Sequence, residues 1–431
     1  MYDKGVSIKK LILLPVSFFG LLLLVFFLSG NPFNISTQAQ SLPAQGELGT
    51  SEVSEQDAQK AQDYFYPREQ KNMESLSRIS VPTPPPGYKQ PSIRKVHPIL
   101  FVAQDKTVLP EHQPAINSTM QLIRRWYSGP LEQNNLGYTF EVANVAVYNA
   151  PFPFSHYQCG RAWCAPDEWI DLDLNVVHAL QDAGYPVLLP GFIHEIFVIG
   201  GGGWASAWCY PDCPVWPDPG PSSGTGVAVV GDWALDAIST GPNPDCVVQM
   251  GSACNKYPQQ GAIAHELGHT FGLYHANDDP RSLMRNWWDF PYVTLIGEPK
   301  NDEIRVVRSN QFIGSRVCTH DSQVIRSNMP STVTKSLPDA PNKFFISFTF
   351  NNYGWCRWTP TTFNTFLVKD NVWGKRRANV LSNVYPAQEY RFRFQLTAPT
   401  TVGRYYSLWK MRKSTTFFGA QVGKQIRVTN P

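Results

Sequence analysis

A short stretch of the chain carries three histidines and a glutamate at spacings that suit a metal ion. Residues 261 to 275 read GAIAHELGHTFGLYH. His265 and His269 are four residues apart, so on a helix both imidazoles project from one face and can bind a single ion. Gly272 can take a left-handed backbone at little cost and end the helix, which lets His275 return toward the same point. The pattern predicts a three-histidine site whose fourth tetrahedral position is left to water.

Glu266 directly follows the first histidine, and we expect it beside the metal and not on it. Three histidines are a donor set that Zn²⁺ uses in catalytic sites, where it acidifies water and polarises a carbonyl group. A carboxylate next to the ion takes the proton of the attacking water and passes it to the leaving amine. We therefore predict Zn²⁺ as cofactor and Glu266 as general base and then general acid in peptide-bond hydrolysis.

The motif resembles that of the metzincin clan of zinc endopeptidases, H-E-x-x-H-x-x-G-x-x-H followed by a turn that contains a methionine. Ser282-Leu283-Met284 follows His275 by a few residues, and the resemblance implies that Met284 packs beneath the metal. Some members carry a tyrosine two residues after this methionine, where the present chain has Asn286. The clan also binds substrate along an edge strand, for which residues 200 to 207 (GGGGWASA) are our candidate.

The elements that position this site are predicted over residues 95 to 330. Apolar runs indicate strands at 99–103, 196–199 and 227–230, and residues 138 to 148 are rich in strand-forming types. Helical spacing of apolar residues indicates helices at 114–127 and 171–183. The alternation predicts an α/β or α+β layer architecture. With the resemblance, we expect α+β with a mixed sheet and an active-site helix.

A separate all-β module is predicted from residue 336 to residue 431. Along residues 389 to 396, Tyr390, Phe392, Phe394 and Leu396 alternate with polar residues, so one face of the strand is apolar. The strings N-x-G-x-C-x-W (Asn352, Gly354, Cys356, Trp358) and G-x-Y-x-x-x-W (Gly403, Tyr405, Trp409) resemble the four-tryptophan Ig-like domain of a selective-autophagy receptor. The resemblance implies a sandwich that binds a protein or a surface polymer, or that acts as a spacer.

The N-terminus predicts export from the cytoplasm. Lys4, Lys9 and Lys10 precede an apolar run at residues 11 to 28, so residues 1 to 30 form a cleaved signal peptide or a retained membrane anchor. Residues 31 to 94 are polar and then proline-rich, which is typical of a disordered linker or a propeptide. A helix at 56–78 is one alternative within this arm. No cysteine precedes Cys159, so the arm cannot place a thiolate on the metal.

The cysteines and the net charge indicate which covalent links and which partners to expect. Eight cysteines in an exported chain predict disulfides, and the spacings favour pairing of 159 with 164, 209 with 213, 246 with 254, and 318 with 356. The chain of 431 residues has 37 Lys and Arg against 34 Asp and Glu, a net charge of +3. A nucleic-acid partner held by bulk charge is therefore not expected.

Together these features predict an extracellular zinc-dependent endopeptidase, secreted or tethered to the membrane, that acts on a protein or peptide substrate. Two alternatives stay open. One is a cell-surface adhesion or binding protein that keeps zinc for structure, although such a site has no need of Glu266. The other is a zinc amidase that acts on cell-wall peptides.

Overall fold

The computed structural model describes residues 47–48, 53–76, 82–158, 172–209, 225–275, 279–297 and 302–431, all within one compact unit, Ala44–Pro431. A sheet with the strand order β4-β2-β6-β8-β7, with β5 also paired to β2, forms the centre of the N-terminal region. The strands are β2 (Lys95–Val102), β4 (Glu141–Val142), β5 (Ala146–Asn149), β6 (Ile193–Val198), β7 (Ala205–Cys209) and β8 (Gly226–Val230). Only β7 among them runs antiparallel to its neighbour.

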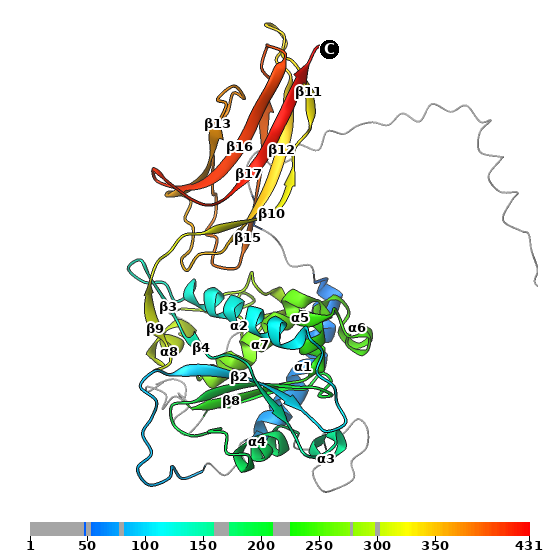
Figure 1. Cartoon of the computed structure of the whole chain (residues 1–431), viewed down its shortest axis with the longest axis vertical. Helices are drawn as coiled ribbons and strands as arrows, with labels where there is room; N and C mark the ends of the chain where they lie inside the picture. Colours follow the sequence, from blue (N-terminus) through cyan, green and yellow to red (C-terminus); the bar gives the residue numbers. More distant parts are fainter. Residues whose placement is uncertain are drawn as a thin grey trace, which may run out of the picture. The chain divides into compact units, whose positions relative to one another are not determined.

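Helices cover both faces of this sheet. Successive side chains of a strand point to opposite faces, so one strand contributes apolar side chains to a core on each side. Ile193 and Phe197 of β6 pack in the core beneath α2 (His112–Ser128), α5 (Asp232–Ser239) and α7 (Lys256–Thr270). Ile196 and Val198 pack in a second core with α3 (Phe154–Gln158) and α4 (Leu172–Asp182). Figure 1 shows the sheet between these two sets of helices. The predicted mixed sheet is confirmed, and the largely parallel, doubly covered arrangement is α/β where we expected α+β.

Shorter elements complete the region around the motif helix. They are α6 (Pro244–Met250), α8 (Glu303–Ser309), the 3-10 helices η1 (Gly251–Cys254) and η2 (Trp287–Asp289), and a ribbon of β3 (Leu136–Thr139) with β9 (Gly314–Val317). The polar arm contributes α1 (Glu55–Leu76), in the place where a helix was one alternative, and the short strand β1 (Glu47–Leu48).

The C-terminal module is a sandwich of two sheets with the orders β1-β15-β12-β10 and β11-β17-β16-β13-β14. Its strands are β10 (Ser322–Asn328), β11 (Thr332–Thr334), β12 (Lys343–Asn352), β13 (Phe363–Lys369), β14 (Arg377–Asn379), β15 (Glu389–Thr397), β16 (Gly403–Lys413) and β17 (Thr416–Thr429). The four apolar residues of β15 are buried as its alternation predicts. Between the sheets lie the buried indoles of Trp358, Trp373 and Trp409.

The sandwich begins earlier than residue 336, because β10 pairs with β12 in its first sheet. The sequence of β10, SQVIRSN, has only two apolar residues, and most of its side chains are exposed. A strand that buries so little carries almost no alternation, which is why the boundary is placed too late from sequence.

The described cysteines are disulfide-bonded, with Cys246 joined to Cys254 and Cys318 to Cys356 as predicted. Cys209 is also bonded, whereas Cys159, Cys164 and Cys213 lie outside the described residues. None of the helices that can be described is long and apolar enough to cross a bilayer. The apolar run at 11–28 lies outside the described residues, so the choice between signal and anchor stays a prediction.

Candidate metal centre

The three histidines of the motif converge on one point. His265 and His269 project from α7, which is buried along most of its length. The helix ends at Thr270, and Gly272 has a φ of 94°, the left-handed conformation expected of it. The Nε2 atom of His275 then lies 2.9 Å from Nε2 of His265 and 3.1 Å from Nε2 of His269.

These distances suit a shared zinc ion. Ligand nitrogens at a tetrahedral zinc are about 3.3 Å apart, since each Zn–N bond is about 2.0 to 2.1 Å. The ligand atoms of the three histidines all lie within 4.8 Å of one another. Three imidazoles that aim the same ring nitrogen at one point fit a Zn²⁺ site.

Two of the rings are oriented by backbone carbonyl groups. Nδ1 of His265 lies 3.1 Å from the carbonyl oxygen of Leu283, and Nδ1 of His269 lies 2.7 Å from that of Leu273. A proton on Nδ1 donates to the carbonyl and leaves the Nε2 lone pair free for a metal. The surrounding chain thus selects the tautomer that a metal site needs.

Met284 lies against the motif helix. Its side chain is 1% exposed, and a Cβ atom added at Gly268 would come within 2.8 Å of its sulfur. Any residue other than glycine at 268 would therefore push the methionine away from the helix.

The turn at residues 282 to 284, here called the methionine turn, is held in place by hydrogen bonds to Glu303 of α8. The sequence analysis did not single out this glutamate. Its carboxylate accepts hydrogen bonds from the Ser282 hydroxyl at 2.6 Å and from the Ile296 backbone N–H at 2.7 Å. The Ser282 oxygen in turn accepts from the N–H of Met284 at 3.0 Å. Glu303 is 4% exposed, so this buried carboxylate fixes the turn whose Leu283 carbonyl orients His265.

Glu266 is fully buried on α7 next to His265, and His269 is 3% exposed, whereas His275 is exposed. Beneath the helix, the buried Tyr127 hydroxyl donates to the carbonyl of Ala264 at 2.8 Å. Glu195 of β6 is also buried on this side of the sheet, and burial raises its pKa well above the ordinary range. Burial thus favours the neutral carboxyl form of Glu195 beneath the motif helix.

The candidate substrate strand is partly where we expected it. β7 begins at Ala205, inside the segment 200–207, while the glycines before it form a turn. β7 pairs only with β8, so among the described strands its outer edge is open for an extended peptide. Substrate binding along β7 stays a prediction.

The helix α1 brings aromatic side chains to the site that sequence reasoning missed. The ring centroid of Phe65 lies 6.2 Å from that of His265, and the centroid of Tyr66 lies 5.0 Å from that of His275. The one available signal is the run Tyr64-Phe65-Tyr66 in an otherwise polar arm.

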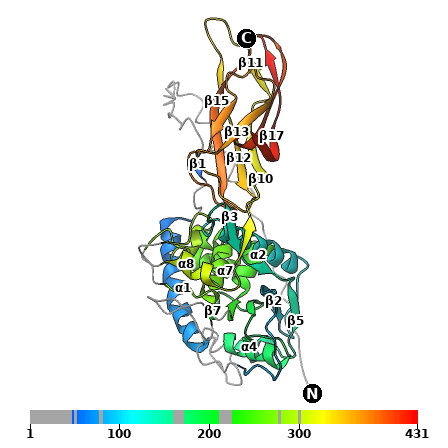
Figure 2. The same cartoon turned by 90° about the vertical axis from the view of Figure 1, so that its left-hand side faces the viewer.

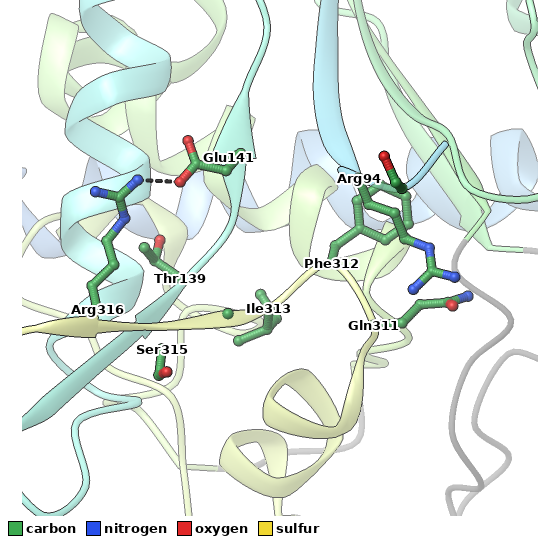
Figure 3. A pocket seen from close by; sticks show the side chains of 10 residues that line it. Arg94, Thr139, Glu141, Gln311, Phe312, Ile313, Ser315 and Arg316 are labelled. Atoms are coloured by element: carbon green, nitrogen blue, oxygen red, sulfur yellow. Dashed lines mark hydrogen bonds and ion pairs between the residues drawn. The ribbon is translucent and has the colours of Figure 1, made fainter. Parts of the chain in front are cut away.

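A hollow of about 200 Å³ lies elsewhere, between the end of β4 and the β3–β9 ribbon (Figure 3). Its lining includes Arg94 and Phe312 together with the ion pair of Arg316 and Glu141. Glu141 also pairs with Arg124 at 2.5 Å, and both of these arginines lie over the ring of Trp355 in the sandwich. Arg124 and Arg316 share the carboxylate of Glu141 and both lie over the Trp355 ring, so we assign this hollow a structural role.

The sandwich is joined to the N-terminal region by several further contacts. The Ser128 hydroxyl donates to the carbonyl of Trp355 at 2.8 Å, and the N–H of Arg357 donates to the Glu132 carboxylate at 2.9 Å. The Gln388 amide donates to the carbonyl of Pro291 at 3.0 Å. The Cys318–Cys356 disulfide lies in the same junction, next to β9.

Comparison with known proteins places the C-terminal module in a family. The model of the Ig-like domain from next to BRCA1 gene matches residues 332–428, which confirms the predicted Ig-like module. None of the curated proteins matches the chain in sequence.

Among solved structures, the chain is similar to OgpA from Akkermansia muciniphila, in complex with an O-glycopeptide substrate, at 11% identity and a TM-score of 0.33. That match covers 81% of this chain and 97% of the other. It is also similar to metalloproteinase-II from Bacteroides fragilis at 13% identity and a TM-score of 0.28, over 59% of this chain and 69% of the other.

Proposed function

We propose that the chain is an exported zinc-dependent endopeptidase of the metzincin type, with a C-terminal Ig-like module. The observation that carries the proposal is the convergence of three histidine Nε2 atoms beside Glu266 on α7, above a buried methionine turn. His265, His269 and His275 would hold Zn²⁺, which when bound polarises a carbonyl group and lowers the pKa of water.

The residues of the chain then supply the rest of the chemistry. The carbonyls of Leu283 and Leu273 hold the histidine rings in the tautomer that can bind the metal. Glu266 takes the proton from the attacking water and returns it to the nitrogen of the leaving amine. The backbone of an extended substrate would pair with the open edge of β7.

The presence of Glu266 separates a hydrolase from a protein that keeps zinc only for structure. A structural zinc site is closed by four protein ligands, whereas the described residues near this cluster offer three histidines. The apolar run at 11–28 supports export, and the Ig-like module is suited to hold the enzyme near a protein or a surface polymer. We propose a protein or peptide substrate on these grounds.

The test of the proposal is Glu266→Gln, with Glu111→Gln on the exposed start of α2 as the matched control. Both variants and the natural chain are assayed for zinc content and on a peptide library. Glu266→Gln should keep one zinc per chain and lose about 10²- to 10⁴-fold in kcat/KM, because only the proton transfer is removed. Retained activity in Glu266→Gln would remove this residue from its role, and zinc without cleavage in the natural chain would favour a binding protein.

A further inference from the structure

We propose that the outer face of the second sheet of the sandwich, β11-β17-β16-β13-β14, binds a linear acidic polysaccharide. The patch that binds it, here called the basic face, consists of Lys369, Arg376, Arg404, Lys410, Arg412 and Arg427. The inference goes beyond the proposed function, because it concerns the Ig-like module and not the metal site. In Figure 2, β17 of this sheet lies on the opposite side of the sandwich from β1 and β15 of the other sheet.

The positive charge of the chain is concentrated in the sandwich. Residues 322 to 431 carry 16 Lys and Arg against 3 Asp and Glu, a net charge of +13, so the total of +3 leaves −10 for residues 1 to 321. The five strands of the second sheet contain eight Lys and Arg and no Asp or Glu. Such a difference between two parts of one chain favours an anionic partner for the basic part.

The alternation of the strands places these charges on one face of the sheet. Trp409 and Met411 of β16 are buried between the two sheets, so Lys410 and Arg412 project from the opposite face. The two residues that flank Arg427 in β17 are also buried in this core, so the arginine shares the outer face with them. The cations therefore form a continuous surface across neighbouring strands.

Aromatic rings hold three of these cations in place. The guanidinium carbon of Arg412 lies 4.1 Å from the centroid of the Phe366 ring, and that of Arg376 lies 5.6 Å from the same centroid. Nζ of Lys369 lies 4.0 Å from the centroid of the Tyr406 ring. A guanidinium group held on a ring keeps its N–H edge for a carboxylate or a sulfate, and it loses less side-chain entropy when the anion binds.

The basic face has no acidic partner of its own. None of its six cations takes part in an ion pair among the residues that the structure describes. Asp370, the one acid next to them in the sequence, accepts a hydrogen bond from the N–H of Tyr406 at 2.6 Å. The charges are therefore not needed to neutralise other parts of the sandwich.

One pair of arginines works against the stability of the sheet. Arg404 of β16 lies directly opposite Arg427 of β17, and both side chains are exposed. Like charges that face each other across two strands destabilise a sheet. An anion bound between the two guanidinium groups would offset this repulsion, whereas the fold alone gives no reason for the pair.

The arrangement of the face favours an acidic polysaccharide among anionic partners. The cations are distributed over β13, β16 and β17 and over the turn before β14, which suits an extended polymer with repeated negative charges. Single-stranded nucleic acids need ring faces on which bases can stack, but the Phe366 and Tyr406 rings are occupied by cations. The predicted export of the chain also places the module outside the cytoplasm, where cell surfaces carry acidic polysaccharides.

The central experiment measures binding of the full chain to immobilised dextran sulfate and polygalacturonate, with uncharged dextran as the reference polymer. We expect saturable binding to both acidic polymers and none to dextran. The Kd should rise steeply with added NaCl, because salt screens exposed charges over about 8 Å at physiological ionic strength. The chain stripped of zinc should bind equally well, since no residue of the basic face belongs to the histidine cluster.

Charge reversal tests whether this face is the binding surface. Lys410→Glu combined with Arg412→Glu should raise the Kd for dextran sulfate by about 10- to 100-fold, because a hydrogen bond to a charged group contributes a factor of about ten or more. The matched control is Lys343→Glu with Arg393→Glu, which changes the net charge equally in the first sheet. The control should leave the Kd unchanged, and an equal loss in both double variants would show attraction by overall charge alone and overturn the basic face.

Phe366→Leu tests the positioning role of the ring, because it leaves every charge in place. We expect the Kd to rise by about two- to fivefold, as the cations lose the ring that holds them, and Phe366→Tyr should restore the natural value. A Kd that is the same in Phe366→Leu and the natural chain would remove the ring from this role.

Arg404→Gln gives a readout that a merely structural arginine would not give. Without polymer, the variant should be more stable in denaturant than the natural chain, because the repulsion from Arg427 is removed. In the presence of dextran sulfate it should bind more weakly. A variant that is less stable and binds equally well would contradict the proposal.

The remaining outcomes decide between classes of partner. Equal binding to uncharged dextran would overturn a role for the cations. Tighter binding of duplex DNA than of dextran sulfate at equal concentrations of negative charge would favour a nucleic acid, and binding only to vesicles that contain phosphatidylserine would favour a membrane surface. Either result would overturn the polysaccharide as the partner of this face.

Discussion

Removal of the Glu303 carboxylate should weaken the metal site, although this side chain does not touch it. In Glu303→Ala the Ser282 hydroxyl and the Ile296 N–H lose a buried acceptor at 2.6 and 2.7 Å. A hydrogen bond to a charged group contributes about 1.5 to 3 kcal/mol, so the free energy of unfolding should fall by about 3 kcal/mol or more.

The zinc affinity should fall as well, since the same turn carries the Leu283 carbonyl that orients His265. Loss of groups that orient a metal ligand lowers metal affinity by about 10- to 100-fold. We would measure zinc affinity by competition with a chelator and stability by denaturant unfolding of the zinc-free chain. Partial recovery of the zinc affinity in Glu303→Asp, with an unchanged number of zinc ions per chain, would agree with a positioning role for Glu303.

The matched control is Arg305→Ala on the same helix. Arg305 is half exposed and pairs with Asp302 at 3.3 Å, an exposed ion pair that contributes about 1 kcal/mol or less. If Glu303→Ala lowers stability but leaves the zinc affinity equal to that of Arg305→Ala, the turn does not orient His265. That result would refute the reasoning.

Two further predictions concern stability. Replacement of both Cys318 and Cys356 by alanine opens a loop with a sequence separation of 38 and should lower the free energy of unfolding by about 4 kcal/mol, measured in denaturant against the natural chain with its disulfides intact. An unchanged midpoint would show that the bond does not stabilise the module junction. Burial, with His97 nearby, lowers the pKa of His194 from 6.5 to about 3, so the unfolded chain binds a proton that the folded chain refuses. The contribution of His194 to the free energy of unfolding should therefore be fully present above pH 6.5 and should be lost as the pH drops toward 3, by about 5 kcal/mol at most. His194→Phe should remove this part of the dependence of the free energy of unfolding on pH. An identical pH dependence in the variant would contradict the assignment.

The convergence of the three motif histidines could be predicted from sequence because it depends on local geometry. Four residues on a helix place His265 and His269 together, and a glycine at 272 is enough to return His275 to them. The same holds for β15, whose alternation alone determines which face is buried. In each case the residue repeat of a single helix or strand determines which side chains share a face.

The bracing and covering residues could not be predicted, because they depend on contacts between distant parts of the chain. Glu303 reaches Ser282 across 21 positions, and Tyr66 reaches Arg285 across 219. Glu303 has no sequence signal that distinguishes it from a surface residue, and Tyr66 has only the aromatic run Tyr64-Phe65-Tyr66 in an otherwise polar arm. β10 was missed for a related reason, since its place is determined by pairing with β12 and not by its own apolar pattern.

The most direct test of the central claim is zinc-dependent cleavage by the full chain. The protein is stripped with a chelator, titrated with Zn²⁺, and assayed on an unbiased peptide library beside the Glu266→Gln variant. We expect that cleavage returns in proportion to bound zinc, saturates at one ion per chain, and stays absent in Glu266→Gln although zinc binds equally well. Cleavage that persists without metal, or one bound zinc with no cleavage in the natural chain, would contradict this claim.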